Sequence, residues 1–324
     1  MGATDNDSST PFQRVDSSDA WDNVGMPPSL RWDKSRKEMY VDFVGYMTCC
    51  PERMAELLIS IGFFFLGGQV PTWWASVYDW EGSPIPYQET ANGDVLVELD
   101  LNYEVLSETV PVWMLLLLGI LLPVVLLLVM GVCSGPPGDA HASLCVYFLA
   151  VGMNLFITNM MKIYCGRFRP NFYGMCEFDT DAKACANDMA NAHKSFPSGH
   201  SSLSFCAMTV LSLYFLGKVG LHRMPTTDTP KNYPSLITKL QAWTAFAIPL
   251  GLAVFVASSR VHDFYHHPAD VVAGAAIGMV CAHFATGLWY PSVYSNLAGY
   301  PLQYLYYQDQ LLPASSESVG SISL

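Results

Sequence analysis

The sequence predicts an all-α, polytopic membrane protein built as a bundle of six transmembrane helices. Of its 324 residues, 51% are hydrophobic and only 14% are charged. Six apolar stretches reach the roughly 20 residues that a helix needs to cross a bilayer. The stretch from Val110 to Val132 contains no charged side chain and is longer than the helices of ordinary globular cores. We therefore expect one membrane-embedded bundle.

The apolar stretches follow one another along the chain with polar loops between them. In chain order they are Met54 to Trp74, Val110 to Val132, Ala142 to Met161, Gly199 to Val219, Leu240 to Ala257, and Ala269 to Trp289. Polar clusters follow the third stretch, open the fourth, and bridge the fifth and sixth. Gly274 and Gly278 in the sixth stretch form a small-residue pair that allows two helices to approach closely.

The polar ends of the chain divide it into three regions. Residues 1–53 are expected to form a cytosolic N-terminal tail, since Met1 to about Lys37 is rich in Ser, Asp and Pro. Residues 54–289 form the six-span domain, and residues 290–324 are expected to form a cytosolic C-terminal tail. The N-terminal region lacks the apolar core of a cleavable signal peptide, so we expect the first span to direct insertion.

The distribution of Lys and Arg predicts the orientation of the bundle. An even number of spans leaves both termini on one side, and cytosolic loops carry an excess of positive charge. The loop from Ser76 to Thr109 has no Lys or Arg. Basic residues gather instead before the first span and around the loop between the fourth and fifth: Arg31, Lys34, Arg36, Lys37, Arg53, Lys218, Arg223, Lys231 and Lys239. Both termini are therefore predicted to be cytosolic, with the polar clusters facing the lumen or the exterior of a plasma membrane or endomembrane.

Net charge and cysteines limit the partners and the environment. The net charge of −12 argues against nucleic acid as a partner, since nucleic-acid binding requires a basic face. Cys176 and Cys185 lie in the loop between the third and fourth apolar stretches, which is predicted to face outward. There they form either a disulfide or two free thiols. Cys49 and Cys50 precede the first span and are candidates for palmitoylation. The sequence leaves the oligomeric state open, a homo-oligomer included.

Three polar clusters at helix ends face the same compartment and indicate a phosphate-handling site. A phosphate monoester brings about two negative charges, and its hydrolysis is extremely slow without a catalyst, so the site needs fixed positive charge and a nucleophile. Lys162, Arg169 and Arg260 are suited to bind phosphate oxygens. Taken singly, each of these residues could instead be an anchor that reaches the headgroups from a helix end.

The second cluster, Pro197-Ser198-Gly199-His200, directly precedes an apolar span. Its backbone N–H groups would form a helix N-terminus, which binds anions with the help of the helix dipole. Gly199 would allow a phosphate oxygen to approach closely. His200 could act as a general acid toward the leaving alkoxide. Ser198 could equally be an ordinary N-cap, and His200 an interfacial residue.

The third cluster supplies a candidate nucleophile. Pro268 is placed to begin the last helix, which leaves His266 just before it and Asp270 in its first turn. If Asp270 accepts the Nδ1 proton of His266, the bare Nε2 can attack phosphorus. Asp270 could also serve only as a helix-start carboxylate. The spacing of His262 and His266 resembles a zinc protease helix, but Pro268 and the lack of a third ligand argue against a metal site.

Together the clusters closely resemble the motifs of the type 2 phosphatidic acid phosphatase superfamily, specifically its integral-membrane lipid phosphate phosphatases. The resemblance covers Met54 to about Trp289 and rests on three motifs: Lys162-x6-Arg169-Pro170, Pro197-Ser198-Gly199-His200 and Ser259-Arg260-x5-His266-x3-Asp270. It implies that His266 is the nucleophile, Asp270 its partner and His200 the acid. It further implies phosphate binding by five residues, and activity without magnesium, metal or other cofactor. The five are Lys162, Arg169, Ser198, Gly199 and Arg260.

The function that follows is magnesium-independent hydrolysis of phosphatidic acid to diacylglycerol and phosphate through a phosphohistidine. Lysophosphatidic acid, diacylglycerol pyrophosphate and sphingosine 1-phosphate present similar headgroups and are expected substrates. One alternative is a six-span transporter or non-catalytic membrane protein that only holds anions. Two others keep an enzyme with a different reaction: a lipid phosphotransferase, or a haloperoxidase of the superfamily, whose soluble architecture does not fit this chain.

Overall fold

The computed structural model describes residues 51–77, 84–136, 138–186, 191–220, 235–295 and 297–305. The expectations for the N-terminal tail, for Cys49 and Cys50, and for the end of the C-terminal tail lie outside these residues.

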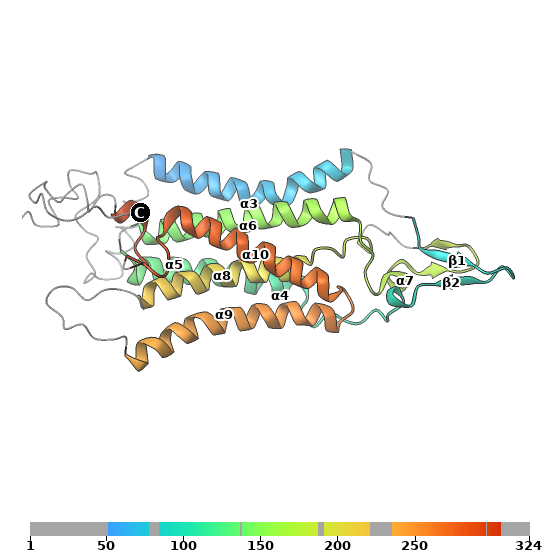
Figure 1. Cartoon of the computed structure of the whole chain (residues 1–324). Helices are drawn as coiled ribbons and strands as arrows, with labels where there is room; N and C mark the ends of the chain where they lie inside the picture. The colour runs from blue at the N-terminus through green and yellow to red at the C-terminus, as the bar shows by residue number, and fades with distance from the viewer. Residues whose placement is uncertain are drawn as a thin grey trace, which may run out of the picture.

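Within the described residues, six helices are long and apolar enough to cross a membrane, so the predicted six-span, all-α architecture is confirmed. They lie side by side along one direction (Figure 1). Their bounds are α3 Pro51–Val77, a composite span over Val112–Ser134, α6 Asp139–Cys165, α8 Gly199–Val219, α9 Leu236–His262 and α10 Pro268–Trp289.

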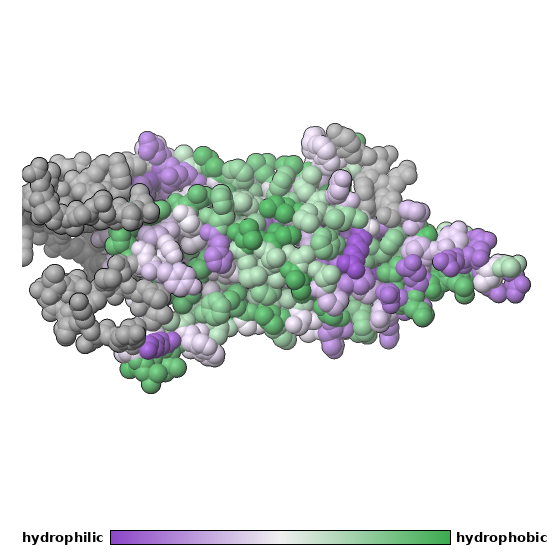
Figure 2. Space-filling view, in the orientation of Figure 1, coloured by the Kyte–Doolittle hydropathy of each residue, from purple (hydrophilic) through white to green (hydrophobic). Residues whose placement is uncertain are grey.

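The outer surface of the bundle is apolar, as expected for helices that face lipid. Large hydrophobic side chains such as Phe65, Trp113, Ile248 and Val272 are exposed on four different spans. Figure 2 shows this hydrophobic surface along the helices, with hydrophilic residues gathered toward the end that carries the strands. The chain is therefore an integral, multi-pass membrane protein.

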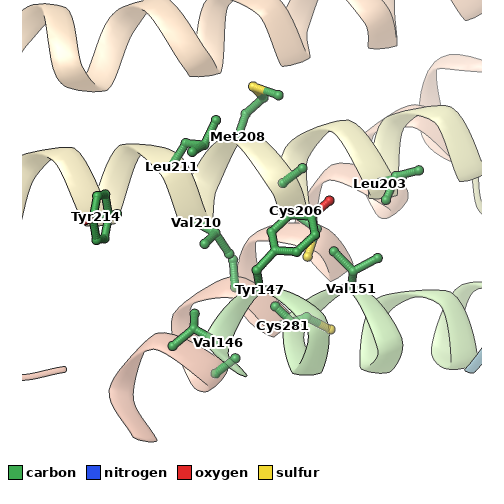
Figure 3. Close-up of a cluster of buried hydrophobic side chains, with 14 of the residues drawn as sticks. Val146, Tyr147, Val151, Leu203, Cys206, Met208, Val210, Leu211, Tyr214 and Cys281 are labelled. Carbon is green, nitrogen blue, oxygen red and sulfur yellow. The ribbon is translucent and has the colours of Figure 1, made fainter. Parts of the chain in front are cut away.

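Helix α8 occupies the centre of the bundle and packs against α6, α9 and α10. Its buried side chains Cys206 and Val210 lie toward Tyr147 of α6, whereas Met208 and Leu211 lie on the opposite side of α8; all belong to the main core cluster (Figure 3). Since lipid is as apolar as these side chains, close packing stabilises the cluster more than removal from water does. The position of α8 matters for the site, because the residues at its N-terminus come to lie between the other motif-bearing segments.

Glycines set the closest helix approaches, as the sequence predicted for the sixth span. A Cβ added to Gly274 would lie 2.5 Å from the Ser198 carbonyl oxygen, and one added to Gly278 would lie 2.7 Å from the Cys206 nitrogen. Both glycines face α8 and bring α10 against its first turns. The close approach fixes the start of α10 beside the start of α8.

The second span is interrupted by a π-helical turn. It consists of α4 Val112–Leu116, η2 Leu117–Leu121 and α5 Leu122–Ser134. Pro123 has no N–H to donate, which removes the usual partner of the Gly119 carbonyl four residues earlier. The Tyr147 hydroxyl of α6 donates to that carbonyl. A buried backbone acceptor freed by proline is thus satisfied from the neighbouring helix.

A small cap extends beyond one end of the bundle (Figure 1). It contains a hairpin of β1 Tyr87–Glu89 and β2 Val95–Val97, the short helices η1 Leu99–Leu101 and α7 Phe172–Cys176, and a hairpin of β3 Phe178–Asp179 and β4 Ala184–Cys185. Cys176 and Cys185 form a disulfide, which decides between the two alternatives that the sequence left open. Phe172 and Tyr173 form the cap's own small core with Leu101.

At the opposite end of the bundle, a buried carboxylate joins three helices. Asp139 at the start of α6 accepts hydrogen bonds from Tyr214 (2.6 Å), Lys218 (2.6 Å) and Tyr290 (2.9 Å). Lys218 also donates to the Gly299 carbonyl at 2.7 Å. The described part of the region after α10 therefore packs against the helix ends.

Candidate active site

The three predicted motifs meet at the cap end of the bundle. They lie at the end of α6 and the loop after it, at the start of α8, and in the turn from α9 to α10. Hydrogen bonds join them in pairs. The Ser198 N–H donates to the Asp270 carbonyl (2.9 Å), and Arg169 Nη1 donates to the Tyr265 carbonyl (3.3 Å). Residues that are 72 and 96 positions apart in the sequence therefore share one small region, as a common site requires.

His266 is buried, and its ring orientation is fixed by the backbone. Nδ1 lies 2.7 Å from the carbonyl oxygen of Ser195. A carbonyl only accepts hydrogen bonds, so Nδ1 carries the proton and Nε2 keeps a free lone pair. The hydrogen bond to Asp270 that we expected is not formed, since the nearest carboxylate oxygen is 3.8 Å from Nδ1. The predicted tautomer is therefore present, but a carbonyl that the sequence did not indicate selects it.

Burial also keeps His266 uncharged. Loss of hydration lowers the pKa of His266 to about 3; the positive charges of Arg169 and Lys162 act in the same direction, and Asp270 opposes them. The imidazole is thus neutral at physiological pH. A neutral ring with a free Nε2 is the form that can act as a nucleophile.

Asp270 is fully buried and receives hydrogen bonds from three residues. Arg167 Nη1 donates at 2.7 Å, the Ser195 hydroxyl at 2.6 Å and the His267 N–H at 2.9 Å. The last of these is part of a capping box at the start of α10, so Asp270 does cap the helix. It is also the negative charge next to His266, at 3.8 Å from Nδ1, where it would stabilise a positive charge on that ring.

The three predicted phosphate-binding cations surround the same region. Arg260 is only 1% exposed, and its Nη2 lies 2.9 Å from Asp263 Oδ2. The guanidinium carbons of Arg169 and Arg260 both lie 5.7 Å from the centroid of the Tyr265 ring. Lys162 donates to the Lys194 carbonyl at 2.9 Å. Specific partners within the protein therefore hold the positive charges of these three side chains in place.

The start of α8 combines capping with an open backbone. Ser198 is the N-cap, and its hydroxyl accepts from the Ser201 N–H at 3.4 Å. Only Lys162 would contact a Cβ placed on Gly199, at 3.5 Å from Cε. The first N–H groups of a helix lack partners within it, which leaves those of Gly199 and His200 as donors. His200 Nε2 is buried and has no hydrogen-bond partner among the described residues.

Sequence reasoning missed four residues that hold the motifs in place. Ser195 binds both His266 and Asp270, and Arg167 binds Asp270. Asp263 and Glu108 both form ion pairs with Arg260. Arg167 and Ser195 lie within three residues of recognised motif positions, and that proximity was the available signal. Glu108 is about 150 positions away from Arg260, and no local pattern connects them.

The remaining histidines of these segments have other roles. His193 is buried against Phe168 and Phe172. His262 is 78% exposed and lies 3.0 Å from Asp263. No group of three His, Cys, Asp or Glu side chains in the described ranges is arranged to hold a metal ion.

Known proteins similar to this chain place it in a family. The PAP2 superfamily matches residues 143–293, which contain all three motifs. Lipid phosphate phosphatase 1 of Arabidopsis thaliana is 32% identical over 246 residues, covering 72% of this chain and 71% of that protein. Lipid phosphate phosphatase 2 of the same plant is 31% identical over 220 residues, covering 64% and 71%. Diacylglycerol pyrophosphate phosphatase 1 of Saccharomyces cerevisiae is 29% identical over 181 residues, covering 50% and 58%.

No solved structure matches the chain. The six-span fold and these similarities define its class, which is that of the integral-membrane phosphatases, enzymes that hydrolyse phosphoric monoesters. Within that class, the chain belongs to the PAP2 superfamily, the type 2 phosphatidic acid phosphatase family.

Proposed function

We propose that this protein is a magnesium-independent lipid phosphate phosphatase that converts phosphatidic acid to diacylglycerol and phosphate. The observation that carries the proposal is the neutral His266 ring, with Nδ1 bound to the Ser195 carbonyl and Nε2 free, in a region that holds three fixed cations. A phosphatase needs this combination, because the nucleophile must be unprotonated while the anionic substrate is held by positive charge.

The reaction proceeds by two displacements at phosphorus. In the first, His266 Nε2 attacks, the bond from phosphorus to the lipid oxygen breaks, and His200 gives its proton to the departing alkoxide. A bound phosphate dianion favours the protonated form of a neighbouring imidazole, which prepares His200 for this step. In the second, water attacks the phosphohistidine, His200 accepts a proton from it, and the N–P bond breaks to release phosphate and the neutral ring.

The phosphate would be held by the residues that the motifs supply. Arg169 and Arg260 bind equatorial oxygens with their guanidinium groups, and Lys162 adds a point charge. Ser198 and Gly199 bind the same oxygens at the start of α8, where the backbone N–H groups of the first helical turn donate to them. Asp270 stabilises the positive charge that His266 acquires during attack.

The position of the site at helix ends supports a lipid substrate. An acyl chain in the bilayer would deliver its phosphate to that level by lateral diffusion, and the membrane would bind the rest of the molecule. The relatives named for lipid phosphates and for diacylglycerol pyrophosphate support the same substrate class. Lysophosphatidic acid, diacylglycerol pyrophosphate and sphingosine 1-phosphate are further proposed substrates. We place the site on the lumenal or extracellular side, away from the Lys- and Arg-rich loops.

A phosphate-release assay without magnesium tests the proposal. Purified protein is incubated in EDTA with each of the four lipids in mixed micelles, and His266→Ala is compared with wild type. We expect the wild type to release phosphate and His266→Ala to lose at least about 1000-fold in rate, as nucleophile removal typically costs. His262→Ala is the matched control, since it removes an exposed imidazole four residues away.

A wild-type protein that releases phosphate from none of the lipids would refute the proposal and favour the anion-binding transporter. Transfer of phosphate to an added alcohol in place of water would indicate the phosphotransferase. Full turnover by His266→Ala would remove the nucleophile from the mechanism.

A further inference from the structure

Glu108 places a carboxylate against the cations that are proposed to bind phosphate. Its Oε2 lies 3.4 Å from Nη1 of Arg260. Arg260 in turn shares the Tyr265 ring with Arg169. Burial lowers the pKa of Arg169, and the negative charge of Glu108 is the strongest influence in the opposite direction. Glu108 therefore acts on both guanidinium groups.

The chain on both sides of Glu108 is tied to the third motif. On one side, the Tyr265 hydroxyl donates to the Leu106 carbonyl at 3.1 Å. On the other, Thr109 donates to Asp263 from both its N–H and its hydroxyl, each at 2.7 Å. These contacts fix the backbone on both sides of Glu108, so the side chain starts from a fixed position beside Arg260 while its carboxylate stays free to rotate.

The two carboxylates that bind Arg260 differ in how firmly they are held. Asp263 is 1% exposed and accepts hydrogen bonds from Thr109 and Arg260. Burial raises the pKa of Asp263, but hydrogen bonds from His262 and Thr109 and the charge of Arg260 together bring it below its usual range. The Glu108 side chain is 28% exposed, and its Oε2, although a buried atom, makes no hydrogen bond within the described residues beyond the 3.4 Å ion pair with Arg260. Of the two, Glu108 is the one that can leave.

We propose that the Glu108 carboxylate occupies the anion position of the Arg260 and Arg169 pair in the free enzyme and is displaced when substrate phosphate binds. This inference rests on the proposed phosphatase function and adds a residue that sets affinity. A phosphate dianion and a carboxylate on the same guanidinium groups repel each other, so Glu108 must move away for substrate to bind. It thereby weakens the binding of phosphate, product included, and helps the product to leave.

The test compares binding of inorganic phosphate to purified full-length wild type and Glu108→Gln by isothermal titration calorimetry. Removal of the competing charge is expected to lower the dissociation constant of phosphate by about three- to tenfold, the range for one partly screened charge pair. In the lipid assay, the inhibition constant of inorganic phosphate should fall by the same factor. Glu104→Gln is the matched control, since it removes an exposed charge from the same segment, and it should leave both constants unchanged.

The inference is overturned if Glu108→Gln binds phosphate equally well or more weakly, because Glu108 would then orient Arg260 instead of competing with substrate. A wild type that binds no phosphate also overturns it. If Glu108→Gln does not fold, Glu108→Ser provides the same comparison. A wild type that binds phosphate but hydrolyses no lipid phosphate refutes only the proposed function. In that case the ratio of the phosphate dissociation constants of wild type and Glu108→Gln still decides the role of Glu108.

Discussion

At the residue scale, His266, the proposed nucleophile, depends on Ser195 in two ways. The Ser195 carbonyl fixes the His266 tautomer, and its hydroxyl donates to Asp270 at 2.6 Å. Four-residue spacing predicted that His266 and Asp270 would be near one another, and they are. Spacing could not predict the hydrogen bond between His266 and the Ser195 carbonyl, because Ser195 lies 71 positions before His266 in the sequence. The path of the loop that carries Ser195 is decided by tertiary packing.

Substitutions around Asp270 test whether its setting supports catalysis. Ser195→Ala removes the hydroxyl but keeps the carbonyl, and Arg167→Gln removes a charged hydrogen bond from Asp270. Each is expected to lower kcat by about 10- to 100-fold with little change in KM, since a hydrogen bond to a buried charge is worth about 1.5–3 kcal/mol. Arg167→Lys should restore part of the loss. An unchanged kcat in both variants would show that Asp270 needs neither partner.

Stability should depend on pH through His266. Its pKa of about 3 in the folded protein lies below the usual 6.5, so the folded state binds fewer protons than the unfolded state between these values. The contribution of the neutral His266 ring to the free energy of unfolding is therefore complete above pH 6.5 and is lost as pH falls toward 3. Between pH 7 and pH 5 we expect a loss of about 1–2 kcal/mol. Thermal unfolding of wild type and His266→Gln checks this, because the variant should lose less stability over that interval; equal losses would contradict a neutral buried ring.

At the element scale, the start of α10 is held beside the start of α8 by glycines, and that contact aligns two of the three motifs. The small-residue pair in the sixth span was visible in the sequence, whereas its partner helix was not. Periodicity shows which residues share a face of a helix, but the identity of the opposing helix depends on the whole arrangement of the bundle.

A pair of alanine substitutions in α10 tests this contact. A Cβ on Gly278 would collide with the backbone of α8, while one on Gly287 would meet nothing within 4 Å. Gly278→Ala is expected to lower the free energy of unfolding by about 1–3 kcal/mol through overpacking, and to reduce activity by shifting the motifs apart. Gly287→Ala should be nearly neutral. Thermal unfolding in detergent measures both, and equal stability of the two variants would contradict the packing described.

At the scale of the whole molecule, the sequence predicted the six spans and their order, and the structure differs mainly at their ends. The third and fifth helices, for example, extend to Asp139–Cys165 and Leu236–His262, several residues beyond the apolar stretches. Hydropathy marks the part of a helix that lies in lipid, whereas polar residues such as Asp139 and Arg260 continue the helix through specific partners. The cap was not predicted at all, because its strands are short and its core is small.

Orientation in the membrane is a prediction for the whole chain. A cysteine in place of Glu89 in the cap should react with an impermeant maleimide added to the non-cytosolic side of sealed membranes. A cysteine in place of Lys231, in the loop between the fourth and fifth spans, should react only after the membrane is permeabilised. The opposite pattern would place the site in the cytosol and contradict the inference drawn from the Lys and Arg distribution.

The most direct test of the central claim is to trap the phosphorylated enzyme. Wild-type protein is mixed with radiolabelled phosphatidic acid, quenched at alkaline pH to preserve the acid-labile N–P bond, and digested for mass spectrometry. We predict one phosphorylated residue, His266, with phosphate on Nε2 and none in His266→Ala. Phosphate on any other side chain, or rapid turnover with no labelled histidine, would contradict the account.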